Sequence, residues 1–216
     1  MKKNGSKHFV AQYFTGEILV QLGRFEESLP YFKEAIQINP NAKECLVSLG
    51  NAFQKLKLFE KALESYEKAV NIDNQYAIAF LNQGLTYMQM DQLEKSLIYL
   101  QKAAELGLKE ANMHKALVLH KLGKNEESLE TFNIIINKYP DNLQFRTYKC
   151  MVLVKLERIQ EAIKCLDELI EISPDNEEAY IRKESLLDRQ YGNSSQELKD
   201  FQNIMIKKGF LPQILE

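Results

Sequence analysis

Residues 43–76 read KECLVSLGNAFQKLKLFEKALESYEKAVNIDNQY, and the rest of the chain is organised around this stretch. Its first half has apolar or small residues at the i, i+3, i+4, i+7 spacing of an amphipathic helix, at Leu46, Leu49, Gly50, Phe53 and Leu56. Its second half repeats the spacing at Phe59, Ala62, Leu63, Tyr66, Ala69 and Val70. Because only Lys57 and Leu58 separate the halves, we predict two helices folded back as a hairpin.

The same pattern recurs along the chain with a period of 34 residues, shortened to 32 in the third copy. The copies span residues 9–42, 43–76, 77–108, 109–142 and 143–176. A small residue returns at the place where two backbones must approach closely, at Gly16, Gly50, Gly84, Ala116 and Cys150. We expect residues 1–8 to form a polar tail, and residues 177–216 to form a degenerate sixth copy with a C-terminal capping helix.

A 34-residue helix–turn–helix period with these small and aromatic positions resembles the tetratricopeptide repeat (TPR) family over residues 9–176. No copy carries the family's tryptophan. The resemblance implies an all-α protein, an α-solenoid of helical hairpins that forms a right-handed superhelix. It also implies a non-catalytic scaffold or adaptor, a subunit of a larger assembly, that holds a partner helix or peptide in the concave groove lined by the first helices.

The positions that line this groove in the family are mostly apolar here. The predicted groove residues are Tyr13, Phe14, Asn51, Ile78, Leu81, Asn82, Leu85, His114, Leu117, Tyr148 and Met151. Apolar and aromatic side chains with a few polar ones are typical of grooves that bind amphipathic helices. An alternative is that several of the aliphatic residues simply pack between adjacent first helices.

A co-chaperone that binds the acidic C-terminal tail of a chaperone is the alternative function. The family members with this function hold two carboxylates with lysine, asparagine and arginine side chains. Asn51 and Asn82 match that set, whereas Val47, Glu110 and His114 stand where two lysines and an arginine are needed. Because Glu110 would repel a carboxylate, we rank this role below the general scaffold.

Composition and motifs indicate no cofactor and no catalytic or metal site. The formal net charge of −2 gives no basic face for nucleic acid. His114 and His120 are six residues apart and point to different sides of a helix. We expect Cys45, Cys150 and Cys165 to be reduced thiols in an intracellular, most simply cytoplasmic, protein, and an organellar import role for the N-terminal tail is an alternative.

The two ends of the array differ. The first helix, FVAQYFTGEILVQL, is apolar on nearly every side. A helix of this kind is normally covered all round, so we expect the N-terminal end to contact another chain, as a homodimer or within a complex. The segment SQELKDFQNIMIKK has one apolar stripe and one polar face, as an end cap requires.

No apolar run is long enough to span a membrane. We also predict that capping boxes start two helices, at Asn41 with Glu44 and at Asp175 with Glu178.

Overall fold

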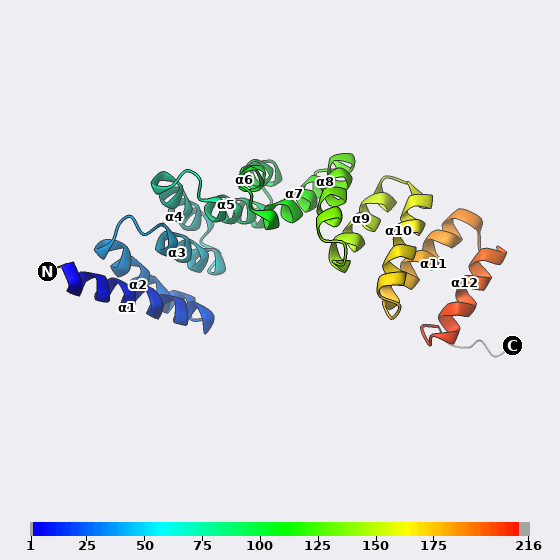
Figure 1. Cartoon of the computed structure of the whole chain (residues 1–216), viewed down its shortest axis with the longest axis horizontal. Coiled ribbons are helices and arrows are strands. Elements are labelled where there is room, and N and C mark those ends of the chain that lie inside the picture. Colours follow the sequence, from blue (N-terminus) through cyan, green and yellow to red (C-terminus); the bar gives the residue numbers. More distant parts are fainter. Residues whose placement is uncertain (1, 212–216) are drawn as a thin grey trace. The chain divides into compact units, whose positions relative to one another are not determined.

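The computed structural model describes residues 2–211, which fold into twelve α-helices without a strand (Figure 1). This confirms the all-helical repeat fold predicted from the sequence. Residues 212–216, the end of the predicted C-terminal region, lie outside the described part. The helices are α1 (Lys2–Gln21), α2 (Phe25–Ile38), α3 (Lys43–Lys55), α4 (Phe59–Ile72), α5 (Ala77–Gln89), α6 (Leu93–Glu105), α7 (Lys109–Lys121), α8 (Asn125–Lys138), α9 (Leu143–Lys155), α10 (Ile159–Ile172), α11 (Glu177–Tyr191) and α12 (Gln196–Lys207).

The helices form two compact units, Met1–Leu122 and Gly123–Glu216. Unit 1 contains α1 to α7 and unit 2 contains α8 to α12, so the boundary falls inside the fourth sequence repeat. Within each unit, every helix packs against its neighbours in the chain, and first helices of successive hairpins in unit 1 also contact each other. Within residues 2–211, no helix has the length and apolar character that a membrane crossing requires.

The turn inside each hairpin places one residue in the left-handed conformation. These residues are Gly23, Lys57, Asp91, Gly123 and Glu157, with φ between 58° and 76°. At four of these turns, a backbone N–H after the left-handed residue donates to a carbonyl in the last turn of the helix, as from Leu58 N to Phe53 O at 2.9 Å. This bond satisfies a carbonyl that the helix end would leave free. The short break expected at Lys57 and Leu58 is therefore a helix-ending turn shared by the copies.

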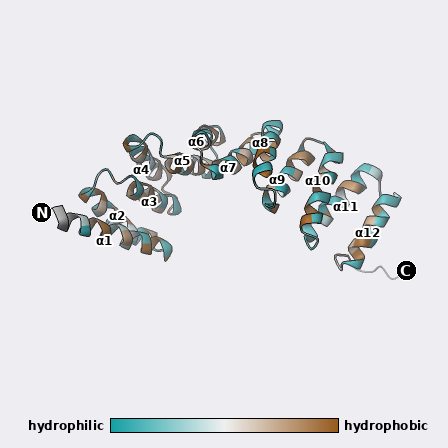
Figure 2. Cartoon of the chain, in the orientation of Figure 1, coloured by the Kyte–Doolittle hydropathy of each residue, from teal (hydrophilic) through white to brown (hydrophobic). Residues whose placement is uncertain are grey.

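The small residues of the repeat lie where the two helices of a hairpin touch. A methyl group on Gly16 would lie 2.6 Å from Cε1 of Phe32, and one on Gly50 would overlap the ring of Tyr66. Phe32 and Tyr66 are completely buried. Hydrophobic and hydrophilic positions alternate along these helices (Figure 2), a pattern typical of helices with one apolar side. The close approach thus creates the core of each hairpin.

The helix starts differ from those expected. The N-cap of α3 is Ala42, which has no side-chain cap, so the predicted capping box at Asn41 is wrong. The N-cap of α11 is Asn176, whose Oδ1 accepts a hydrogen bond from Ala179 N at 3.2 Å, one residue after the predicted Asp175. The side chain of Asn142 caps α9 in the same way. An asparagine directly before a helix satisfies one of its free N–H groups.

α1 and α12 are the first and last helices of the described residues. α1 begins at Lys2, so residues 2–8, expected as a tail, extend the first helix. His8 and Gln12 on this helix both bond to the Glu34 carboxylate of α2, at 2.8 and 2.7 Å. At the other end, α12 buries Leu198, Phe201 and Met205 against α11.

Candidate functional site

Asn51 and Asn82, from the first helices α3 and α5, meet each other in unit 1. The amide nitrogen of Asn82 donates to Oδ1 of Asn51 at 3.0 Å, and the hydroxyl of Tyr66 donates to the same oxygen at 2.8 Å. Burial raises the pKa of Tyr66, so its hydroxyl stays protonated and keeps donating. This contact links two hairpins and uses one of the two amide hydrogens of Asn82.

Tyr13 and Phe14 begin the candidate site on α1. The Tyr13 ring lies 6.0 Å from that of Phe9 and 6.2 Å from that of Phe32, which places it at the α1–α2 contact. Burial raises the pKa of the Tyr13 hydroxyl. Phe14 is 56% exposed and lies on the outer side of α1 together with other exposed apolar residues. These two neighbours therefore have different surroundings.

The remaining candidates of unit 1 lie on α5 and α7. Ile78 is exposed, Leu81 is buried, and Leu85, His114 and Leu117 are half-buried. Burial lowers the pKa of His114, with an opposing effect from the Glu110 carboxylate. Nδ1 of His114 is buried and has no hydrogen-bond partner among the described residues. At neutral pH His114 is consequently an uncharged, partly apolar ring.

Tyr148 and Met151 lie on α9 in unit 2, and both are half-buried. The Tyr148 ring stacks on that of Phe132 from α8, with centroids 5.8 Å apart. This packing fixes the ring direction and leaves part of its surface open to solvent. An aromatic held in this way loses little entropy on binding.

A hollow that was not predicted from the sequence lies between the second helices α2 and α4 and over α3. It has a volume of about 440 Å³. Its floor is the buried side of α3, and lysines from α2 and α4 line its edge; the residues include Leu46, Leu49, Phe53, Lys33, Lys61 and Lys68. The i, i+7 spacing of Lys61 and Lys68 next to core positions is the signal that would have indicated it.

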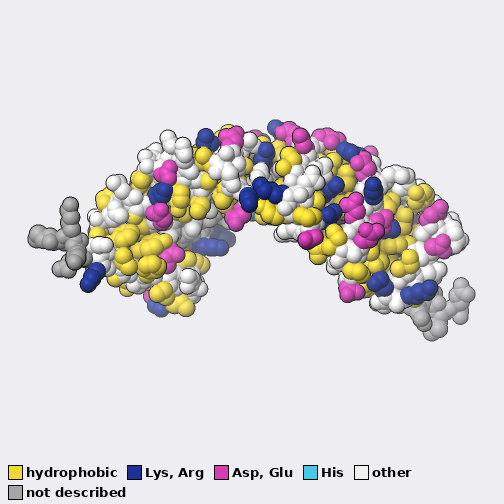
Figure 3. Space-filling view, in the orientation of Figure 1, with side chains coloured by type: hydrophobic (Ala, Val, Ile, Leu, Met, Phe, Trp, Pro, Cys, Tyr) yellow, Lys and Arg dark blue, Asp and Glu magenta, His cyan; other side chains and the backbone are white. Residues whose placement is uncertain are grey.

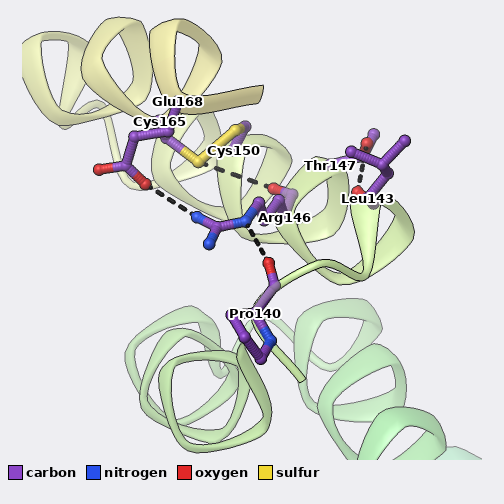
Figure 4. Close-up of a disulfide and its surroundings, with 7 residues drawn as sticks. All are labelled: Pro140, Leu143, Arg146, Thr147, Cys150, Cys165 and Glu168. Atoms are coloured by element: carbon purple, nitrogen blue, oxygen red, sulfur yellow. Dashed lines mark hydrogen bonds and ion pairs between the residues drawn. A yellow bond between two sulfur atoms is a disulfide. The ribbon is translucent and has the colours of Figure 1, made fainter. Parts of the chain in front are cut away.

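Cys150 and Cys165 are joined by a disulfide between α9 and α10 (Figure 4). Their Cα atoms are 5.6 Å apart. Cys150 occupies the small-residue position where the helices of a hairpin touch, so a cysteine there lies beside the facing helix. The expectation of reduced thiols is wrong for Cys150 and Cys165. These two cysteines therefore give no support for a reducing compartment. Cys45 is the free cysteine; burial raises the pKa of its thiol to about 12.

Arg146 lies beside the Cys150–Cys165 disulfide and bonds to two other segments of unit 2 (Figure 4). Its Nη1 lies 3.0 Å from Oε2 of Glu168 on α10, and its Nε donates to the backbone carbonyl of Pro140 at 2.9 Å. The Arg146 side chain is 16% exposed. One guanidinium therefore ties α9 both to α10 and to the loop before α9.

Replacing Arg146 is expected to destabilise unit 2 without touching the candidate groove. Arg146→Met leaves the Pro140 carbonyl and the Glu168 carboxylate without their donor, which costs about 1–2 kcal/mol of unfolding free energy. Arg182→Met is the matched control, because Arg182 and Glu178 form an exposed pair within α11 worth less than about 0.5 kcal/mol. Urea unfolding of both variants measures the difference, and equal losses would contradict the assigned role.

The described residues contain no group of three or more histidine, cysteine, aspartate or glutamate side chains placed to hold a metal ion. The candidate residues are mostly apolar side chains, together with the amides of Asn51 and Asn82 and the ring of His114.

Comparisons with known proteins agree with the architecture. Models of the tetratricopeptide repeat match residues 8–75, 77–106, 110–142 and 151–176. No curated protein matches the sequence. Among solved structures, YrrB, described as a TPR protein with an unusual peptide-binding site, is 18% identical with a TM-score of 0.68, over 85% of this chain and 94% of YrrB. MamA is 19% identical with a TM-score of 0.70, over 88% and 98% of the two chains. Pseudomonas aeruginosa pilF is 18% identical with a TM-score of 0.69, over 93% and 99%.

Proposed function

The chain belongs to the tetratricopeptide repeat family, and we propose that it is a non-catalytic scaffold or adaptor within a larger assembly. Its first helices bind a helix or extended segment of a protein partner. The observation that carries this proposal is that the first helices of each unit hold apolar side chains that remain partly or fully open to solvent. They are Ile78, Leu85 and Leu117 in unit 1, and Tyr148 and Met151 in unit 2. The peptide-binding site of YrrB, whose fold is similar, supports it.

The observations favour this apolar groove over the chaperone-tail alternative. Val47, which stands where a carboxylate-binding lysine is needed, is buried with 5% of its surface exposed. Oδ1 of Asn51 already accepts two hydrogen bonds within the fold. A site without the lysines has no strong donors for two carboxylates. An acidic C-terminal peptide is therefore expected to bind weakly or not at all.

The N-terminal end is proposed as a second contact surface, and we assign Phe14, predicted from the sequence as a groove residue, to this surface instead of the groove. Exposed apolar residues on α1 favour contact with another protein chain, and a second copy of this chain is one such partner.

Groove binding is tested with the partner that co-purifies from the native source, using the segment of it that binds. Tyr148→Ala is expected to weaken the affinity about thirtyfold, the effect of losing an anchoring aromatic worth about 2 kcal/mol. Ile78→Ala, at an exposed position in unit 1, is expected to weaken it about fivefold, or roughly 1 kcal/mol. Raising the salt concentration is expected to change the affinity little, since the surface carries few charges.

Gln160→Ala is the matched control for these variants, because Gln160 is exposed on α10, a second helix, and is not a groove candidate. Circular dichroism must show the same helix content for all three variants. Unchanged affinity in both Tyr148→Ala and Ile78→Ala, or loss of binding at moderate salt, would show that the partner contacts another surface.

A further inference from the structure

The outer side of α1, with Leu22 directly after it, carries four exposed large apolar residues spaced four apart. They form the α1 stripe: Val10, Phe14, Ile18 and Leu22, which are 45%, 56%, 56% and 64% exposed. Residues four apart lie on one side of a helix, and the stripe runs about 18 Å along it. Figure 3 shows hydrophobic side chains gathered over α1 and α2.

The position that Ile18 occupies in the repeat is buried in every later hairpin. Ile18 corresponds to Ala52, Thr86, Val118, Val152 and Leu186 in the following first helices, and these are between 0% and 6% exposed. There the second helix of the preceding hairpin packs on the first helix of the next, as α2 does on α3 and α10 on α11. Within residues 2–211 no hairpin precedes α1. Ile18, in the middle of the α1 stripe, is therefore at a position that the rest of the fold buries under a helix, whereas Val10 is at a position that stays exposed, as Ile78 is.

We propose that a second copy of this chain covers the α1 stripe, with α1 packed against α1 in a closed two-fold dimer. This deepens the second contact proposed above and is independent of groove binding. The opposite end of the chain is a poor cover, because α12 exposes Glu197, Lys199, Asp200 and Asn203 beside the exposed apolar residue Ile204. Burying these polar groups against the stripe would be unfavourable. The surface that a second copy can offer is its own stripe, which gives a closed, self-complementary interface.

Charge and spacing favour an antiparallel pair. Rows of residues four apart on two helices interdigitate well, and a two-fold axis near Gly16 places Phe14 opposite Ile18 of the second copy. Lys7 is exposed at the amino end of the stripe, and Glu26 is exposed in the first turn of α2, beside its carboxyl end. An antiparallel pair brings Lys7 of one copy toward Glu26 of the other, whereas a parallel pair brings like charges together.

Sedimentation velocity of the full chain across a concentration series tests the proposal. The mass is expected to rise from 25.1 kDa to twice that value, with a dissociation constant on the order of micromolar, as suits a small apolar interface. Ile18→Glu is expected to raise this constant at least about a hundredfold by placing a charge at the centre of the contact. Ile98→Glu is the matched control, because Ile98 is 67% exposed on α6, away from the stripe, and it should dimerise like the wild type.

A charge exchange tests the direction of the pair. Lys7→Glu is expected to weaken dimerisation about threefold to tenfold, and Lys7→Glu combined with Glu26→Lys to restore it. A chain that stays monomeric at every concentration, dimers that Ile18→Glu leaves intact, or oligomers that keep growing with concentration would each overturn the proposal. The proposed function is tested separately, by the effect of Tyr148→Ala on the affinity for the groove partner. Failure of the dimer proposal and failure of the proposed function are therefore distinguishable.

Discussion

A chain lacking residues 195–216 is expected to lose at least about 3 kcal/mol of the unfolding free energy of unit 2. α12 removes Leu198, Phe201 and Met205 from water, each with at most 7% of its surface exposed. Full burial of such a side chain contributes about 1.5–3 kcal/mol, which the entropy of ordering the helix partly offsets. The truncation also exposes Tyr180 and Leu187 beneath it, so the shortened chain should self-associate more strongly than the full chain.

Point variants separate the packing of α12 from the effect of shortening the chain. Phe201→Ala is expected to cost about 3 kcal/mol, since its ring stacks on Tyr180 with centroids 5.7 Å apart. Lys199→Ala, on the exposed side of the same helix, should change the stability by less than about 0.5 kcal/mol. Urea unfolding and sedimentation give both readouts. A truncated chain as stable and as weakly associated as the full one would contradict the role of α12 as an end cap.

The repeat made most of the fold predictable from the sequence. Gly16, Gly50 and Gly84 recur at one position because a side chain there would overlap Phe32, Tyr66 or Leu100. Only the correct pairing of the two helices explains that recurrence, so the hairpins follow from it. The turns were predictable for the same reason, since the three residues between the two helices of a hairpin leave few conformations.

Contacts made by single residues were not predictable from the repeat. The disulfide depends on a cysteine at position 165 facing the contact position of Cys150, and both replace residues that differ between copies. The hydrogen bond from Asn82 to Asn51 depends on how the two neighbouring first helices are placed. A periodic pattern specifies which side of a helix faces inward, but not which side chains of two helices meet.

The candidate site was predictable only as a set of first-helix positions. The apolar character of these positions is visible in the sequence, but their exposure depends on the neighbouring hairpin. Leu81 and Ile78 are three residues apart on α5, yet one is buried and the other is 43% exposed. Phe14 shares its position in the repeat with Asn82 and differs because nothing within residues 2–211 covers that side of α1.

Reducing the Cys150–Cys165 disulfide is expected to lower the unfolding free energy of unit 2 by about 3 kcal/mol. The bond closes a loop with a sequence separation of 15 residues, and a loop of that length restricts the unfolded chain by about this amount. Cys150→Ala is the informative variant, because an alanine occupies the same position in the fourth copy and keeps the close helix contact. It should have the stability of the reduced wild type and should not respond to reductant.

Counting thiols provides the second measurement. Three cysteines and one disulfide leave a single thiol, Cys45, which is buried. Because burial raises its thiol pKa to about 12, Cys45 should react very slowly with an alkylating reagent in the folded protein at pH 8. The unfolded, unreduced chain should then show one reactive thiol, and the reduced chain three. Three thiols without reductant, together with a stability that reductant does not change, would show that Cys150 and Cys165 contribute only by packing.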